Sequence, residues 1–329
     1  MIPQRTIVLL AAALAAAALV AFKVNCARNG TQPPSRPPAG AKPAGPDSKA
    51  PDDIPLPAEK DLANLYRRIA ADLKDGKPLT VTVYVALCDN VHQGIVKVPA
   101  RLGNGDDARN NLYWGALYGL YGEFKRAPDY ALVSRKKSSD GVILETVVFR
   151  KQIAPNAFWK RLGVTDGFEM LVVGKAYRGR NIGRAVKDFA AALFTDGAEE
   201  LTLPGGQKIT AGGAGHLAGF IGHNHLMDVA REDYPFKKIT KTGRRQKGAF
   251  VLCCRSYSYF SQHILDRRVH NLVMTKSLMA PESYTVRYLL DAVAKGGEIR
   301  ELRKACAAAY ANYQKISTRA AERVFCSGD

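Results

Sequence analysis

The sequence predicts an α/β domain built on a mostly parallel sheet with helices on both faces. Two observations indicate this fold: the alternation of two kinds of segment along the chain, and the share of apolar residues. Short runs rich in β-branched residues alternate along the chain with segments whose apolar residues recur at helical spacing. Such alternation is typical of a parallel sheet whose two faces are both covered. Apolar residues make up 47% of the chain, which is enough for a sizeable core.

The elements are expected in the following order. A helix is predicted over residues 61–74, where Leu62, Leu65 and Ile69 share one face, and Gly76 ends it. An apolar, β-branched run predicts a first strand over residues 80–87. Asn111 is expected to cap a helix over residues 112–124. Further strands are expected at 142–149, 167–174, 216–222, 248–254 and 271–275, and further helices from Asn181, at 282–295 and at 298–316.

Composition divides the chain into three segments. Residues 1–30 include the apolar run Ile7–Phe22, which we interpret as an uncleaved membrane anchor, with a cleaved signal peptide as the alternative. Residues 31–58 are rich in proline, which lacks an N–H donor, so an extended linker is expected there. The folded domain is expected over residues 59–329. This organisation predicts a membrane-tethered, extracytoplasmic protein, or an exported one if the segment is cleaved.

The chain is strongly basic, with a formal net charge of +18. A basic run, Lys237–Lys247, lies between two predicted strands, so an anionic partner is one interpretation and a solvated loop the other. No nucleic-acid-binding motif is present, and no specific nucleic-acid partner is expected. The six cysteines follow neither a disulfide framework nor zinc-site spacing. No glycine-rich phosphate loop follows the first strand, so no organic cofactor is expected.

Two predicted strands end in residues that can carry chemistry. Leu217–Gly222 is followed by His223, and Ala249–Leu252 is followed by Cys253 and Cys254. Ligands of parallel sheets bind at the carboxyl ends of the strands, where neighbouring ends lie side by side. An imidazole can remove the proton of a thiol, so a histidine and a cysteine at such an edge can form a catalytic dyad. Because side chains alternate along a strand, only one of the two cysteines is expected to face the cleft, and Cys254 is our choice.

These two strand ends resemble those of the caspase-like cysteine peptidases, a group that includes caspases, metacaspases, gingipains and legumains. The resemblance implies a three-layer caspase-like sheet and a cysteine endopeptidase acting on peptide or protein substrates. It implies that His223 is the general base and Cys254 the nucleophile. It also implies that Gly222 and Asn224 shape the turn and the oxyanion hole, although Asn224 replaces the usual glycine.

In the resembling family, the end of the first strand helps to shape the main specificity pocket. Asp89 and Asn90 occupy that position, so the resemblance implies a substrate-binding role for both. A carboxylate there predicts cleavage after lysine or arginine, because a basic side chain would pair with it. The alternative is that the two residues only form a turn.

Two other classes of function stay open. A caspase-like domain without catalytic activity would be a peptide-binding module. Alternatively, His223, His225 and Asp228 form an H-x-H-x-x-D pattern, and these residue types are the ligands of metal-dependent hydrolases.

Overall fold

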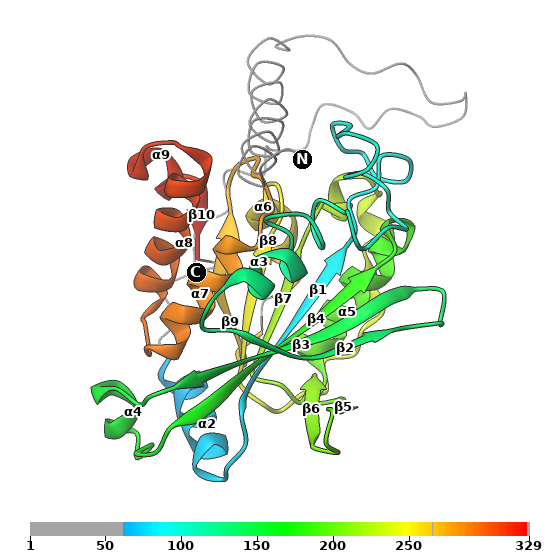
Figure 1. Cartoon of the computed structure of the whole chain (residues 1–329). Coiled ribbons are helices and arrows are strands. Elements are labelled where there is room, and N and C mark those ends of the chain that lie inside the picture. Colours follow the sequence, from blue (N-terminus) through cyan, green and yellow to red (C-terminus); the bar gives the residue numbers. More distant parts are fainter. Residues whose placement is uncertain (1–61, 265, 328–329) are drawn as a thin grey trace, which may run out of the picture. The chain divides into compact units, whose positions relative to one another are not determined.

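The computed structural model describes residues 62–264 and 266–327 of the chain (Figure 1). Residues 62–95 and 99–327 belong to one compact unit. The proposed linker and the segment before it lie outside the described residues. The segment boundaries at residues 30 and 58 therefore stay predictions.

The prediction of a membrane anchor requires correction. No helix within residues 62–264 and 266–327 is long and apolar enough to cross a membrane. Helix α8 (Ile299–Gln314) spans 16 residues and includes charged ones, whereas a spanning helix needs about 20 apolar residues. The run Ile7–Phe22, on which the prediction depended, lies outside the described residues. The membrane tether and the extracytoplasmic location are therefore dropped and enter no proposal below.

The centre of the structure is an eight-stranded mixed sheet in the order β10-β9-β8-β7-β1-β4-β3-β2 (Figure 1). The five adjacent strands from β9 to β4 are parallel, and β2, β3 and β10 are antiparallel to their neighbours. A separate hairpin pairs β5 with β6. The strands are β1 (Leu79–Ala86), β2 (Ala131–Lys137), β3 (Ile143–Ile153), β4 (Phe168–Tyr177), β5 (Ala198–Thr202), β6 (Lys208–Gly212), β7 (Leu217–Ile221), β8 (Lys247–Leu252), β9 (Val269–Thr275) and β10 (Phe325–Cys326).

Helices connect these strands and cover them. They are α2 (Ala63–Lys74), α3 (Leu120–Arg126), α4 (Ala157–Arg161), α5 (Ile182–Phe194), α6 (Ser256–Phe260), α7 (Tyr284–Ala294), α8 and α9 (Thr318–Glu322), with short 3₁₀ turns at η2 (Gly179–Asn181), η3 (His225–Met227), η4 (Arg231–Asp233) and η5 (Pro235–Lys238). The predicted α/β class is confirmed, with a large, mostly parallel sheet flanked by helices.

Both faces of the central strands β1, β7, β8 and β9 are buried, as their near-continuous apolar sequences predict. On one face, α5 and α6 pack in an apolar cluster with strand residues such as Phe220 and Val251, and with Cys253 just beyond β8. On the other face, Leu65 of α2 lies within van der Waals range of the Gly248 position on β8. Helix α7 joins that layer through Arg287, whose Nε donates to Glu123 Oε1 of α3 at 2.8 Å.

The predicted helix over residues 112–124 is wrong over most of its length. Residues 112–119 form turns, and α3 begins only at Leu120. The reason is close backbone packing, because a Cβ on Gly115 would lie 2.1 Å from the carbonyl oxygen of Arg109. Asn111 does not cap a helix, and its side chain instead bonds both the N–H and the C=O of Cys88.

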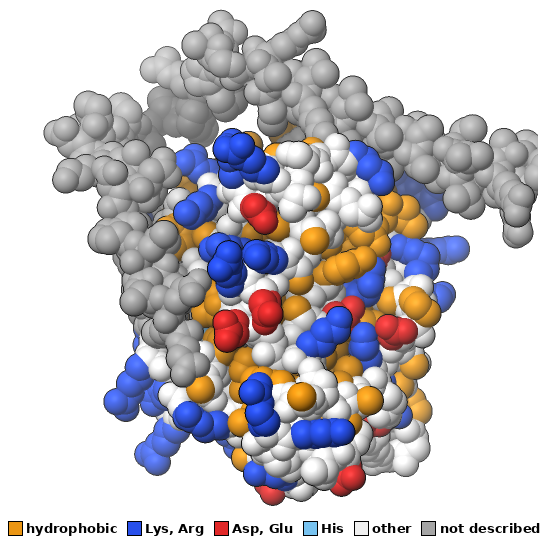
Figure 2. Space-filling model, turned by 90° about the vertical axis from the view of Figure 1, so that its left-hand side faces the viewer, with side chains coloured by type: hydrophobic (Ala, Val, Ile, Leu, Met, Phe, Trp, Pro, Cys, Tyr) orange, Lys and Arg blue, Asp and Glu red, His pale blue; other side chains and the backbone are white. Residues whose placement is uncertain are grey.

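The sequence also did not predict the edge strands β2 and β10. Strand β2 is rich in charged residues and mostly exposed, which hides the apolar alternation that marks a strand. Charged residues protect sheet edges from unwanted pairing, so β2 is composed as an edge strand should be. The basic character continues elsewhere on the surface: on the face in Figure 2, Lys and Arg side chains are more prominent than Asp and Glu.

Candidate functional site

The structure brings the two predicted strand ends together. Strands β7 and β8 are parallel neighbours, with Ile221 paired to Leu252. His223 and Cys254 each lie two residues beyond this pair. The side chain of Asn224 joins the two segments, because its Nδ2 donates to the carbonyl oxygen of Cys254 at 2.7 Å.

The two adjacent cysteines differ sharply in their surroundings. Cys253 is fully buried in the apolar cluster on the α5 side of the sheet. Burial, and secondly the neighbouring Cys254, raises the pKa of the Cys253 thiol well above its ordinary value, so this thiol stays protonated. Cys254 is half-buried and is not part of that cluster. Of the two cysteines, Cys254 is therefore the partly exposed one, whereas its position in a substrate cleft stays a prediction.

The thiol of Cys254 meets the main chain of Met279. The N–H of Met279 lies 3.4 Å from Cys254 Sγ, and the carbonyl oxygen of Met279 lies 3.5 Å from it. The sulfur therefore has both a main-chain donor and a main-chain acceptor within reach, which fix the position of the thiol. Sequence reasoning missed Met279, because its main-chain groups make the contact and its residue type gives no signal.

Met279 belongs to the segment of residues 276–283, which we call the thiol loop. Four hydrogen bonds hold this loop, and each comes from a different part of the fold. They are Lys276 N to Val324 O (2.8 Å), Arg255 N to Ser277 O (2.9 Å), Ala280 N to Tyr310 Oη (3.0 Å) and Ser283 N to Tyr118 O (2.7 Å). The loop that faces the sulfur is therefore fixed in place.

The turn after Cys254 is unusual and well anchored. Arg255 adopts a left-handed conformation (φ 51°), which is uncommon for a residue other than glycine. Ser256 then secures the turn, since Thr275 N donates to Ser256 Oγ at 2.8 Å and Ser256 Oγ donates to Val251 O at 2.7 Å. Strained residues that the surrounding structure holds in place are concentrated at active sites.

His223 has a carboxylate partner that orients its ring. Nε2 of His223 lies 2.7 Å from Oδ2 of Asp228. A carboxylate can only accept, so Nε2 donates and the neutral ring keeps its lone pair on Nδ1. Gly94 N donates to the same oxygen at 3.2 Å, which ties Asp228 to the loop that follows β1.

Asp228 is ionised at neutral pH. Burial acts to raise the pKa of its carboxyl group, but the hydrogen bond and the charge of His223 and the N–H of Gly94 hold it below the ordinary value. A carboxylate beside imidazole fixes the ring and stabilises the imidazolium. The sequence named Asp228 only as a metal ligand, and nothing in its spacing indicated this orienting role.

Gly222, Asn224 and Tyr113 lie close to these two segments. Gly222 (φ 145°) is in a region that favours glycine, and a Cβ there would lie 3.7 Å from the ring of Tyr113. Asn224 is fully buried, and its Oδ1 accepts from Leu226 N at 3.1 Å. Burial raises the pKa of Tyr113 well above its ordinary value, so its hydroxyl remains a donor. A contribution of Gly222 and Asn224 to an oxyanion hole stays a prediction.

Asp89 and Asn90 lie just beyond β1, at the same edge of the sheet. Asp89 is buried, and its Oδ1 accepts from Val91 N (2.9 Å) and His92 N (3.1 Å). Its Oδ2 lies 2.9 Å from Nδ1 of His92. Asn90 N donates to Gly103 O at 2.9 Å. These contacts give both residues a part in the loop, whereas binding of a basic substrate side chain stays a prediction.

The metal alternative is not supported. Within residues 62–264 and 266–327, no group of three or more His, Cys, Asp or Glu side chains could hold a metal ion. His223 and Asp228 contact each other directly, and the ring of His225 lies against Gly183 of α5. His216 lies at the opposite end of β7, where it contacts Asp72.

Comparison of the chain with protein-family models, with curated proteins and with solved structures finds no match.

Proposed function

We propose that this chain is a cysteine hydrolase that cleaves peptide bonds, with Cys254 as nucleophile, His223 as general base and Asp228 as the residue that orients His223. The observation that carries the proposal is the parallel pairing of β7 with β8, which brings the two segments to one edge of the sheet. The hydrogen bond from Asn224 to Cys254 then joins them. Resemblance to the caspase-like peptidases is part of the same proposal.

The proposed mechanism requires the ring of His223 to reach the thiol of Cys254. Nδ1 of His223 takes the proton of the Cys254 thiol, and the thiolate attacks the carbonyl carbon of the substrate. N–H groups near Gly222 and Asn224 stabilise the oxyanion of the tetrahedral intermediate. The imidazolium returns its proton to the amine as the C–N bond breaks, leaving a thioester on Cys254. Water, deprotonated by His223, hydrolyses the thioester and restores the thiol.

An electrophilic peptide probe tests this proposal directly. We expect the wild-type protein to be labelled at one site, Cys254→Ala to lose the label, and Cys253→Ala to keep most of it. Cys253 is a matched control because it is adjacent, chemically identical and buried. Equal labelling of the two variants, with both folded, would overturn the assignment.

A second candidate is a module that binds peptides without cutting them. The contact between Met279 and the sulfur favours it, because main-chain groups of the thiol loop already occupy part of the space around the nucleophile. The same experiment separates the two functions. A binding module would bind peptides reversibly and leave Cys254 unlabelled.

A further inference from the structure

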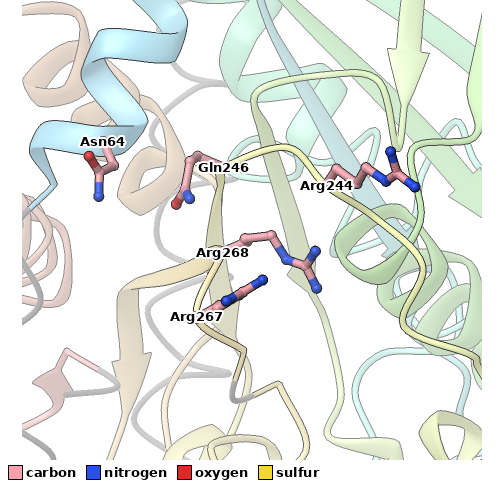
Figure 3. A pocket seen from close by; sticks show the side chains of 5 residues that line it. All are labelled: Asn64, Arg244, Gln246, Arg267 and Arg268. Atoms are coloured by element: carbon pink, nitrogen blue, oxygen red, sulfur yellow. The ribbon is translucent and has the colours of Figure 1, made fainter.

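A pocket lies at the opposite edge of the sheet. It has a volume of about 610 Å³ and is lined by Asn64, Arg244, Gln246, Arg267 and Arg268 (Figure 3). Asn64 belongs to α2, Arg244 and Gln246 precede β8, and the other two arginines precede β9. Because β8 and β9 are parallel, these segments meet at their amino ends. From Gln246 to Cys254 is eight residues of extended chain, or roughly 25 Å, so this pocket is separate from the thiol site.

The polar groups that line this pocket offer donors. Gln246 Oε1 is already occupied, because Nε2 of the buried His270 donates to it at 2.8 Å. Asn64 Oδ1 is also occupied, since Nη1 of Arg67 donates to it at 2.7 Å. Among the described residues, each amide therefore keeps its NH₂ group for a ligand, and a guanidinium has only donors. A pocket of this kind selects a ligand whose atoms accept hydrogen bonds.

The charge in this pocket is only partly balanced. Arg268 pairs with Asp266, its Nε 3.2 Å from Oδ1. In the part of the chain that the structure describes, the exposed side chains of Arg244 and Arg267 have no carboxylate partner. Arg267 and Arg268 lie close to each other in Figure 3, whereas the Arg244 side chain extends away from them.

More positive charge lies behind the lining. Arg68 donates to the carbonyl oxygen of Gln246, and Lys247 donates to that of Ala192 at 2.8 Å. Burial, together with the charges of neighbouring arginines, lowers the pKa of Lys247 to about 8 although Asp196 acts to raise it. Each of these two cations already has a carboxylate partner, Asp72 for Arg68 (3.8 Å) and Asp196 for Lys247 (3.4 Å), so the uncompensated charge of the pocket comes from its lining arginines.

We propose that this pocket binds a multivalent phosphate anion, such as a polyphosphate or the phosphate group of a small ester. The planar guanidinium of Arg267 fits two phosphate oxygens at once, and Arg268 and the two amides supply further donors. Because the pocket holds more than one guanidinium, a ligand with more than one negative charge matches it. This binding site does not depend on the proposed peptidase activity.

Isothermal titration of the whole protein with sodium tripolyphosphate, in 150 mM NaCl, tests the proposal. We expect saturable binding of one anion per chain. Arg267→Gln should weaken it by about tenfold or more, because one bidentate charge-assisted contact is lost. The double variant Arg244→Gln/Arg267→Gln should weaken it further. Arg319→Gln, an exposed arginine on α9 far along the chain, is the matched control and should bind like the wild type.

Absence of saturable binding would overturn the proposal, and so would equal affinity in all four proteins. A nucleic acid is the competing ligand. If a single-stranded oligonucleotide bound with the same dependence on Arg267 and tripolyphosphate failed to displace it, the small-anion proposal would also be wrong. Unfolding of each variant, followed by circular dichroism, confirms that a lost affinity is not a lost fold.

Discussion

The carboxyl and amino edges of the sheet differ in whether their polar side chains have partners within the protein. At the carboxyl edge, reactive groups are paired: His223 with Asp228, and Cys254 with the main chain of Met279. At the amino edge, guanidinium groups gather around a pocket, and Arg244 and Arg267 have no carboxylate partner in the described chain. Paired groups are held in one orientation, as chemistry requires. Uncompensated charge is suited to a ligand that brings the missing charge with it.

The largest effect is expected from removal of the imidazole at the carboxyl edge. His223→Ala should lower the rate of peptide hydrolysis by about a thousandfold, because the thiol loses its base. Rates measured with a fluorogenic peptide library give the comparison. His225→Ala is the control, since this ring lies two residues further on and packs against Gly183. Equal losses in both variants would mean that any change in the segment 223–225 lowers the rate, and that His223 does not act as the base.

The next effect concerns the thiol loop at the same edge. Burial, and secondarily the charge of Glu123, raises the pKa of Glu282 to about 7, although bonds from Tyr284 and Gln314 act to lower it. The folded state thus binds this proton more tightly than the unfolded state, where the pKa is near 4.3. Stability should therefore fall as the pH rises from about 4.5 to 7, by up to roughly 3 kcal/mol.

Urea unfolding at a series of pH values measures this slope. Glu282→Gln keeps the hydrogen-bonding shape without the ionisation, so its stability should vary less over that range. Glu301→Gln is a control, because this glutamate is exposed on α8. An unchanged slope in Glu282→Gln would show that another group titrates.

A smaller effect is expected from the carboxylate that orients the base. Asp228→Asn should lower hydrolysis about tenfold, since residues that orient a reacting group are typically worth that much or more. The loss should fall on kcat and not on KM, and the pH profile should shift. Asp233→Asn, which alters an exposed carboxylate nearby, should leave activity unchanged.

Gly94→Ala tests the contact between His223 and Asp228 by displacing Asp228. A Cβ on Gly94 would lie 2.4 Å from Oδ1 of Asp228, so the carboxylate or the loop must shift and the contact with His223 is disturbed. We expect a loss of activity similar to that of Asp228→Asn. Full activity in both variants would show that Asp228 has no role in hydrolysis.

The smallest effect is expected at the amino edge in the absence of an anion. Arg244→Gln/Arg267→Gln breaks no ion pair within the described residues, so stability at low ionic strength should change by less than about 1 kcal/mol. It should rise if repulsion among the arginines is significant. Urea unfolding gives this value, and a loss of more than about 2 kcal/mol would show that these arginines have a structural role.

The difference between the edges also explains what could be predicted from sequence. Strands β1, β7 and β8 are short apolar runs, and their ends carry Asp89, His223 and Cys254, so periodicity located both the strands and the candidate residues. The roles of Asp228 and Met279 were not predictable, because they depend on a 3₁₀ turn and on main-chain groups of a loop distant in sequence. The helix over residues 112–124 failed because its glycines serve close backbone contacts, which apolar spacing does not reveal.

The central claim is that His223 activates the thiol of Cys254. The most direct measurement is the rate of alkylation of Cys254 by iodoacetamide as a function of pH, followed by mass spectrometry of the peptide that contains it. We predict that the wild-type thiol reacts with an apparent pKa well below the ordinary value of about 8.5, and that His223→Ala returns it toward that value. Identical profiles in the two proteins would contradict the account.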